Sequence, residues 1–390
     1  MPLPGKADIW RRPSGGDALP ADAISESERR SCLRLARTSN IGPVTFAGLI
    51  ARFGTATTAL EAVPALARRG GAVQPLKIPT AADANRELES LARLGGRLLT
   101  VLDADYPHGL AALDAPPPVL SVLGHPGLLA RDIVAIVGAR NASALGRKLA
   151  QILAADLGKA GLVVVSGMAR GIDAAAHDGA LATGTCAVLA GGVDNIYPPE
   201  NAVLYDKLKA EGAIISEMPL GQAPQARHFP RRNRIISGLA RGVVIVEAAE
   251  GSGSLITANY ALEQGREIFA VPGSPLDPRA KGTNRLIRDG ATLTESAADI
   301  LKVLEPIIGR AFREDERQPS FAFAPADASL ERETDRLRAR LTELIGPAPV
   351  EVDELVRQSG ASPAAALTVL LELELAGRLT RHPGNKVSMA

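Results

Sequence analysis

A short segment in the middle of the sequence combines several arginines with a histidine and contains no acidic residue. Guanidinium groups stay charged at physiological pH, and their planar forks donate paired hydrogen bonds that match a phosphate. The segment therefore predicts a polyanion as partner, although a basic run is also typical of a solvated helix face. Between Met218 and Val246 the residues concerned are Arg227, His228, Arg231, Arg232, Arg234 and Arg241.

This local basic excess contrasts with a chain that is almost neutral as a whole. The 390 residues carry a formal net charge of +1, which excludes a protein that binds nucleic acid over its entire surface. Aromatic residues make up only 3% of the chain, so few side chains can stack on bases. Contacts to phosphates are therefore expected to dominate, and such binding should weaken strongly as the salt concentration rises.

Glycine-rich segments that follow apolar runs provide a second set of candidate anion-binding groups. Glycine lets backbone amides approach an anion closely, and the N-terminus of a following helix adds a favourable dipole. Tight turns without any ligand are the alternative explanation for each single segment. The candidates are Gly138 and Arg140 in the first segment, Ser166, Gly167, Arg170 and Gly171 in the second, and Ser252, Gly253 and Ser254 in a third.

Side chains that could perform catalysis form no recognisable constellation. The first glycine-rich segment is GARNASALG rather than GxGxxG, and neither a P-loop nor an HExxH motif occurs. Asp173 and His177 lie four residues apart on one predicted helix face, and Glu247 and Glu263 are possible bases. We expect His177 to have a structural or ligand-contacting role, and we predict no catalytic residue and no cofactor.

The two cysteines bear on compartment and metal binding. Cys32 and Cys186 lie far apart and form no CxxC pair, which predicts a reducing cytoplasm and no metal site. No stretch approaches the roughly 20 apolar residues that span a bilayer, so no membrane association is expected.

Six apolar, β-branched runs alternate with helical stretches in the central part of the chain. This alternation is the signature of parallel βαβ units, and it predicts an α/β domain with a doubly wound, mostly parallel sheet. In such sheets ligands bind at the carboxyl ends of the strands, where the glycine-rich segments fall. The runs are IVAIVG, LVVVSG, TCAVLAGG, AIISE, GVVIVEA and EIFAVPG.

The flanking segments predict smaller domains and linkers. IGPVTFAGLIARFG resembles a helix-hairpin-helix or SAM-like element, and three consecutive prolines mark a boundary after it. The predicted order is a disordered leader (1–25), a helical SAM-like domain (26–115), a linker (116–130), a Rossmann-like domain (131–304), a second linker (305–330) and a winged-helix-like domain (331–390).

The predicted third helix of the last domain, Ser362 to Ala376, is apolar and acidic. Insertion of this helix into a DNA groove is therefore not expected, because groove reading needs basic or polar side chains on that helix. A role in protein interaction or dimer support is expected instead, with Arg378, Arg381 and Lys386 as a weak phosphate patch. A passive capping domain is the alternative.

The ordered series of motifs resembles the DNA-processing protein A family, also called DprA or Smf, over roughly Val134 to Ala291. The resemblance implies an extended Rossmann-like domain that binds single-stranded DNA, forms a homodimer and passes the strand to the RecA recombinase during natural transformation. Members of that family often carry a SAM-like domain before the core and a winged helix after it. The motifs are IVGAR, VVSGMARGIDAAAH, LAGGVDNIYPPEN, ISEMP, HFPRRNRIISGLARGVVIVEA, SGSLITANYALEQGREIFAVPG and KGTNRLIRDGA.

The resemblance also implies which residues form a positively charged pocket, and we predict a cytoplasmic, non-enzymatic recombination mediator. One alternative is a nucleotide-binding enzyme similar to LOG-type phosphoribohydrolases, whose PGGxGT loop is approximated by GSGSLIT. Another is an adaptor that only gathers partner proteins. The implied pocket residues are Arg140, Ser166, Gly167, Arg170, Arg231, Asn233 and Arg234, with Lys281 and Asn284 as secondary candidates.

Overall fold

A computed structural model describes residues 24–308, 328–382 and 384–390. Most of the predicted leader and of the second predicted linker lies outside these residues. The chain divides into two compact units, which we describe one after the other. The larger unit comprises Glu87–Leu113 and Val119–Arg313, and the smaller one comprises Met1–Arg86, Asp114–Pro118 and Glu314–Ala390.

The larger unit contains a nine-stranded sheet with the strand order β1-β2-β6-β5-β4-β3-β7-β8-β9. Seven neighbouring strands, from β6 to β9, run parallel, and β1, β2 and β6 pair antiparallel at one edge. The strands are β1 (Arg97–Thr100), β2 (Val119–Gly124), β3 (Ile133–Val137), β4 (Val163–Ser166), β5 (Thr185–Val188), β6 (Ala213–Ser216), β7 (Gly242–Ile245), β8 (Glu267–Ala270) and β9 (Thr292–Leu293).

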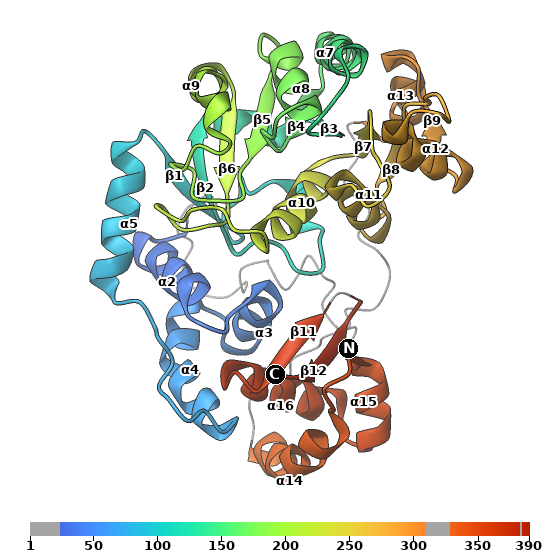
Figure 1. Ribbon diagram of the computed structural model, residues 1–390. Coiled ribbons are helices and arrows are strands. Elements are labelled where there is room, and N and C mark those ends of the chain that lie inside the picture. Colours follow the sequence, from blue (N-terminus) through green and yellow to red (C-terminus); the bar gives the residue numbers. More distant parts are fainter. Residues whose placement is uncertain (1–23, 309–327, 383) are drawn as a thin grey trace. The chain divides into compact units, whose positions relative to one another are not determined.

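Helices cover both faces of the parallel strands (Figure 1). On one face α7 and α8 pack on a cluster that includes Val134, Val164 and Val244, while α10 and α11 lie on the other. The helices are α6 (His108–Ala111), α7 (Ala144–Lys159), α8 (Ile172–Ala180), α9 (Ala202–Glu211), α10 (His228–Leu239), α11 (Gly253–Glu263), α12 (Lys281–Arg288) and α13 (Ala297–Leu304), with short 3₁₀ turns at Pro126–Ala130, Pro199–Asn201 and Pro278–Ala280.

The predicted doubly wound, mostly parallel α/β class is confirmed. Strands β3 to β8 correspond to the six predicted apolar runs, and they are buried on both faces, which explains their continuous Val, Ile and Ala content. The chain reverses its direction of travel across the sheet between β3 and β7. A ligand site is expected beside this switch point, at the carboxyl ends of the strands.

The sheet begins earlier in the chain than the predicted boundary at residue 131. Strand β1 lies in the segment that was expected to be helical, and β2 lies in the predicted linker 116–130. Pro116, Pro117 and Pro118 do end the preceding segment, but Val119 starts a strand directly after them. The two strands pair antiparallel with each other, so they lack the crossover helix that identifies parallel strands in a sequence.

The smaller unit combines the N-terminal helices with a C-terminal winged-helix region. Ser25 caps the first helix through a hydrogen bond from Glu28 N, and Pro43 occupies the first turn of α3. The elements are α2 (Glu26–Arg37), α3 (Pro43–Phe53), α4 (Ala56–Arg69), α14 (Ala328–Leu344), β10 (Val350–Glu351), α15 (Val352–Ser359), α16 (Pro363–Leu375), β11 (Leu379–His382) and β12 (Lys386–Met389); α5 (Ala81–Arg93) spans the boundary with the larger unit.

The third helix of the winged-helix region, α16, is buried along almost its whole length. It packs against α14 and α15, and in the same unit against α4 and α3, where Asn40 Nδ2 donates to Leu375 O at 3.2 Å. A helix that is apolar on all sides needs neighbours on all sides. The apolar character that was expected to keep this helix out of a DNA groove therefore reflects its central position.

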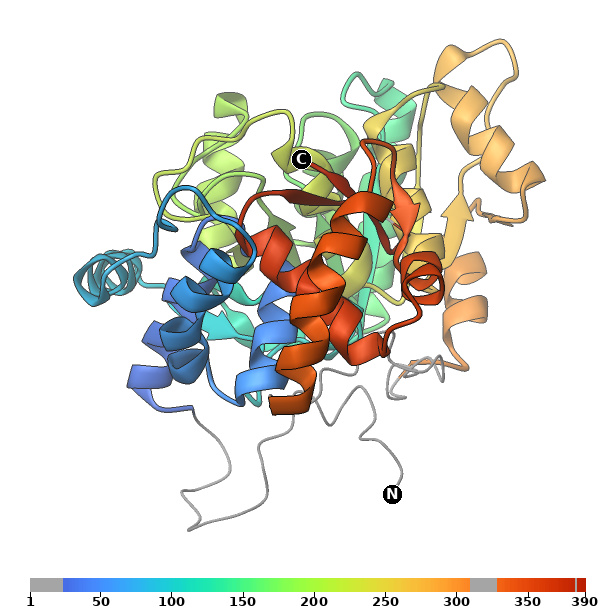
Figure 2. The same cartoon turned by 90° about the horizontal axis from the view of Figure 1, so that it is seen from below.

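Strands β11 and β12 form a C-terminal hairpin after α16, drawn in red in Figure 2. Arg381 and Lys386 of the predicted weak phosphate patch lie on this hairpin, and Arg378 directly precedes it. Arg381 Nε lies 2.8 Å from Glu374 Oε2, and Lys386 Nζ lies 3.7 Å from Glu351 Oε1. These cations are at least partly neutralised by their own domain. Across the described residues, no helix is long and apolar enough to cross a bilayer.

Glu372 is a buried acidic residue in the middle of α16. Its Oε2 accepts hydrogen bonds from Arg338 Nη2 at 2.7 Å and Arg338 Nε at 3.1 Å, while the carboxylate is fully shielded from solvent. Removing one partner of a buried ion pair usually costs about 3–5 kcal/mol, because the other charge stays buried. Arg338 is 21% exposed and can turn to water, so the cost here should be smaller.

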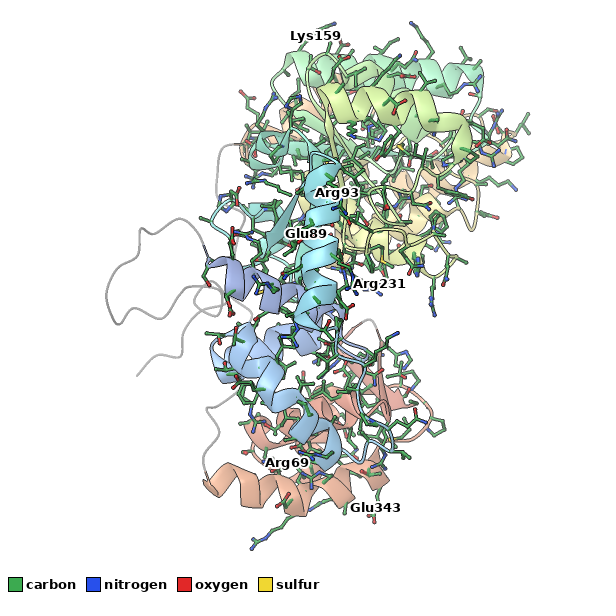
Figure 3. The ribbon with its side chains drawn as sticks, turned by 90° about the vertical axis from the view of Figure 1, so that its left-hand side faces the viewer. Arg69, Glu89, Arg93, Lys159, Arg231 and Glu343 are labelled. Atoms are coloured by element: carbon green, nitrogen blue, oxygen red, sulfur yellow. The ribbon has the colours of Figure 1, made fainter. Side chains whose placement is uncertain are left out.

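We expect Glu372→Ala to lower the free energy of unfolding of the full chain by about 2 kcal/mol. The matched control is Glu343→Ala on α14, an exposed position labelled in Figure 3, which should change stability by less than about 0.5 kcal/mol. Urea denaturation followed by circular dichroism measures both variants. Equal effects of the two substitutions would contradict a stabilising role for the buried pair.

Candidate nucleic-acid interface

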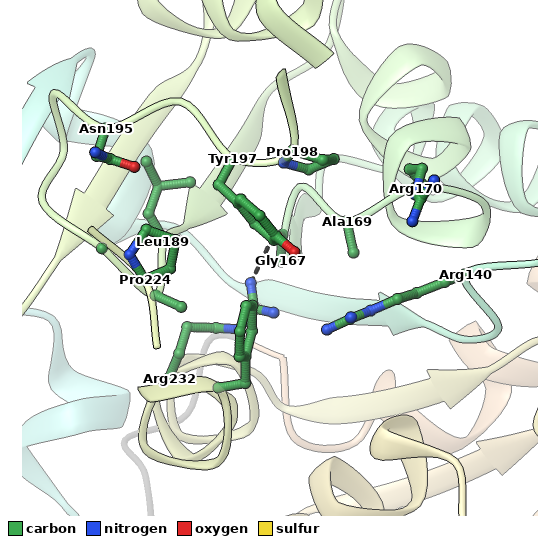
Figure 4. Close-up of a pocket in the computed structure, with 13 residues that line it drawn as sticks. Arg140, Gly167, Ala169, Arg170, Leu189, Asn195, Tyr197, Pro198, Pro224 and Arg232 are labelled. Carbon is green, nitrogen blue, oxygen red and sulfur yellow. Dashed lines mark hydrogen bonds between the residues drawn. The ribbon is translucent and has the colours of Figure 1, made fainter. Parts of the chain in front are cut away.

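A pocket opens at the carboxyl ends of β4 and β5, next to the switch point of the sheet (Figure 4). Its lining comes from the loops after β3, β4, β5 and β6 and from the start of α10. Three arginines belong to this lining: Arg140 after β3, Arg170 after β4 and Arg232 on α10. The structure thus brings together Arg140, Gly167 and Arg170 of the predicted site.

Arg232 forms the floor of the pocket and is almost completely buried. Its guanidinium donates to the carbonyl oxygens of Gly167 and Val188, the latter at 2.8 Å, and its Nε donates to Asn233 Oδ1 at 3.1 Å. Burial lowers the pKa of Arg232 to about 10, with a further lowering by Arg140 and an opposing effect of Asp173. The group therefore stays charged near neutral pH and places a fixed positive charge beneath the pocket.

The loop after β4 is shaped by two close backbone approaches. A Cβ atom at Gly167 would lie 2.1 Å from Arg232 Nη1, and one at Gly171 would lie 2.2 Å from Ala139 O. Gly171 also has φ +81°, a conformation that other residues avoid. Asp173 Oδ2 accepts from Gly167 N at 3.1 Å, which closes the loop. Burial raises the pKa of Asp173, whereas Arg232 and the loop amides lower it.

Two aromatic rings form one wall of the pocket. The centroids of Tyr197 and Phe229 lie 5.8 Å apart at an interplanar angle of 55°, and Tyr197 is 45% exposed. The Arg140 guanidinium carbon lies 5.0 Å from the Phe229 centroid, which is within cation–π range. Neither ring was among the predicted site residues, although Tyr197 lies in the motif NIYPPEN and Phe229 in HFPRRNR.

Other predicted arginines lie near the pocket with acidic neighbours. Arg170 is 63% exposed and its Nη1 lies 3.3 Å from Glu200 Oε1. Arg234 Nη2 lies 2.5 Å from Glu217 Oε2 and is mostly buried, whereas Arg231 is 53% exposed and projects from α10 (Figure 3). Arg231 and Arg170 can therefore reach a ligand more readily than Arg234 can.

The remaining predicted residues contact neighbouring parts of the fold and do not line the pocket. Asn233 Nδ2 donates to Gly253 O at 3.2 Å, Ser166 Oγ donates to Ile136 O at 2.6 Å, and Gly138 packs under Ile172. Ser252 caps α11, where its hydroxyl bonds to that of Ser254 at 2.8 Å. Asn284 exchanges hydrogen bonds with the backbone of Gly273, and Lys281 begins α12.

The candidate bases have structural contacts. Glu247 accepts from Ser143 N at 2.9 Å and from its hydroxyl at 2.6 Å, so it holds the start of α7. His177 is completely buried, and its Nδ1 lies 2.7 Å from Thr185 Oγ1. Among the residues that the structure describes, no cluster of His, Cys, Asp or Glu could hold a metal ion. Both cysteines are buried, and burial raises the pKa of the Cys186 thiol.

Comparison with known proteins places this architecture in a family. A family model described as DNA recombination-mediator protein A matches residues 97–305, more than half of the chain and the same span as the sheet from β1 onward. The chain belongs to this family. Models of the DprA-like N-terminal HHH domain and the DprA winged helix domain match residues 26–90 and 324–385. The family resemblance predicted from the motifs is confirmed.

Curated relatives and solved structures agree with the family. DNA processing protein DprA of Bacillus subtilis is 44% identical over 56% of this chain and 75% of its own, and protein Smf of Escherichia coli is 39% identical over 73% and 75%. The structure of DprA from Streptococcus pneumoniae matches with a TM-score of 0.58 at 32% identity, covering 72% of this chain and 98% of that one.

A second similar structure is that of DNA processing protein A from Helicobacter pylori, described for its single-stranded DNA binding mode. It matches with a TM-score of 0.50 at 29% identity and covers 55% of this chain and 97% of that one. A protein similar to this member of the family thus binds single-stranded DNA.

His177 gives a test of its structural role through pH. The Thr185 hydroxyl donates its proton to Val164 O, so its oxygen accepts a hydrogen bond from His177 Nδ1. The other ring nitrogen, His177 Nε2, is buried and has no hydrogen-bond partner that could accept a proton from it. Burial, with a smaller contribution from Arg232, lowers the pKa of His177 from 6.5 to about 3. Between about pH 6.5 and about pH 3, the His177 side chain is protonated in the unfolded chain but neutral in the folded chain. The free energy of unfolding therefore falls as the pH falls.

We expect the wild type to lose about 2 kcal/mol of unfolding free energy relative to His177→Leu between about pH 7 and about pH 5. Urea denaturation of both proteins at each pH gives this difference directly and cancels the titration of other groups. A difference that does not change with pH would show that His177 is not held neutral by the fold. Single-stranded DNA binding by the folded variant should match the wild type at neutral pH.

Proposed function

We propose that this member of the family binds single-stranded DNA with the pocket beside β4 and β5. The observation that supports this proposal is the meeting of Arg140, Arg170 and Arg232 with the ring pair Tyr197 and Phe229. Guanidinium groups suit the phosphates, and the exposed ring of Tyr197 offers a face on which a base can stack. Neither interaction depends strongly on base identity, so the site suits a strand of any sequence.

We further propose that the protein is a cytoplasmic, homodimeric mediator that loads RecA recombinase onto the bound strand during DNA uptake, and that it is not an enzyme. The family membership supports this role. The enzyme alternative is not favoured, because the GSGSLIT segment on which it rests caps α11 with Ser252 and Ser254. Of the possible bases, Glu247 accepts hydrogen bonds from Ser143 inside the fold and Glu263 is exposed at the end of α11, while His177 is buried against Thr185.

The pocket can be tested with one cation and one ring. We expect Arg140→Ala to weaken binding of a labelled oligothymidylate about tenfold at low salt, because a charge-assisted contact contributes about 1.5–3 kcal/mol in protein interiors and less near water. The slope of log affinity against log salt should become shallower by about 0.7, the value for one phosphate contact on a single strand. Fluorescence anisotropy across a salt series measures both quantities.

A ring variant separates stacking from charge in the same assay. Tyr197→Leu keeps an apolar side chain but removes the exposed ring, so affinity should fall while the salt slope stays unchanged. Lys207→Ala on α9, an exposed cation outside the pocket, is the matched control for loss of one charge. If Arg140→Ala and Lys207→Ala behave alike, the pocket is not the binding site.

The mediator role requires a second assay. Wild-type protein should restore RecA ATP hydrolysis on a single strand that is already coated with a single-strand binding protein, and Arg140→Ala should restore it less. Nucleoside monophosphates incubated with the protein should remain intact, because the proposal includes no hydrolysis. Tight strand binding without any effect on RecA would contradict the loading role and leave only the binding function.

A further inference from the structure

A second hollow lies beside the pocket, on the other side of Arg140 and Arg170. It is an open groove with a volume of about 870 Å³, and its lining includes residues from the loops after β3 and β4, from α7 and α8, and Asn201 before α9. Arg140 and Arg170 line both hollows, so the two adjoin at these side chains. A chain that leaves the pocket past these two arginines enters the groove.

One face of α7 supplies further cations to this groove. Arg147 and Lys148 line it together with Ala144 and Gln151, which are spaced three and four residues apart and therefore lie on the same side of the helix. Both cations are exposed. Within the described parts of the chain neither of them has a salt bridge, in contrast to Lys159 at the far end of α7, which lies 2.8 Å from Asp156 (Figure 3).

The balance of charge and shape in the groove favours an anionic backbone. Four cations line it, and Asp178 is the single acidic residue of the lining. Ala144, Ala174 and Ala175 form small, flat positions between the charged ones, and no aromatic residue contributes to the lining. A groove with cations and amide side chains can bind sugar and phosphate groups, and it offers no ring on which a base could stack.

We propose that this groove binds the sugar-phosphate backbone of the nucleotides adjoining the one held in the pocket, with Arg147 and Lys148 each contacting a phosphate. The proposal rests on the proposed function of the pocket and extends it. The pocket, with its rings, holds a base together with its phosphate, and the groove carries the strand onward along α7 and α8. The start of α7 itself is not the binding group, because Ser143 N already donates to Glu247.

Oligonucleotide length separates the groove from the pocket. We compare Arg147→Ala/Lys148→Ala with the wild type by anisotropy, using a labelled thymidine dinucleotide, which is too short to fill both hollows, and an oligothymidylate of about sixteen nucleotides, the upper end of the site sizes that single-strand binding proteins cover. For the long strand the double variant should bind at least tenfold more weakly. Its salt slope should be shallower by about 1.4, twice the value for one phosphate. The short strand should lose less than twofold.

The matched control removes the same charge from another helix. Lys207→Ala/Lys209→Ala on α9 changes two exposed cations that line neither hollow, so it should leave the slope unchanged. Thermal unfolding followed by circular dichroism should be the same for all three proteins, because the substituted side chains are exposed.

The outcomes distinguish the groove from the pocket. Equal salt slopes for the groove variant and the control would contradict strand binding in the groove. Normal binding by the wild type in the same experiment would still agree with strand binding in the pocket. A wild type that binds neither oligonucleotide would overturn the proposed function itself. A loss of affinity for the short strand as large as that for the long one would also contradict the inference, since it would place Arg147 and Lys148 at the pocket.

Discussion

The buried guanidinium of Arg232 is the constraint on which the site depends. Moving a charged group out of water is strongly unfavourable unless polar groups surround it. Here two carbonyl oxygens, the Asn233 side chain and the charge of Asp173 stabilise the Arg232 guanidinium. The two carbonyls belong to Gly167, directly after β4, and to Val188, the last residue of β5. The hydrogen bonds of this one guanidinium therefore connect α10 to the ends of both strands, between which the pocket lies.

The arginines of the basic segment between Met218 and Val246 differ in burial and in ion pairing. Arg241 pairs with Asp132 beneath the sheet and Arg234 pairs with Glu217, while Arg232 is buried in the pocket floor. Arg227 and Arg231 are exposed, and Arg231 Nε lies 3.3 Å from Glu217 Oε1. A dense basic run thus correctly marked the region, but the sequence could not show which cations are neutralised, because Asp132 lies about a hundred residues away.

The parts of the fold that the sequence predicted well are those with a local signal. Six parallel strands were identifiable because burial on both faces requires continuous apolar runs, and α16 because Ser362 and Pro363 mark its start. Strands β1 and β2 were not identified, since their antiparallel pairing leaves no crossover helix. The ring pair was missed for another reason: Tyr197 and Phe229 are 32 positions apart, and their proximity exists only after the sheet has formed.

A nearly neutral chain can still hold a polyanion because salt limits the range of each charge. At physiological ionic strength the screening length is about 8 Å, so a bound phosphate responds to the cations around it and hardly to the acidic residues elsewhere. Arg140 and Arg170 line both hollows, so each of them lies close enough to attract a phosphate in either one. Binding in the pocket and binding in the groove are consequently coupled through these two side chains. A strand long enough to occupy both should gain more than the sum of two separate fragments, since the second contact pays no new cost of association.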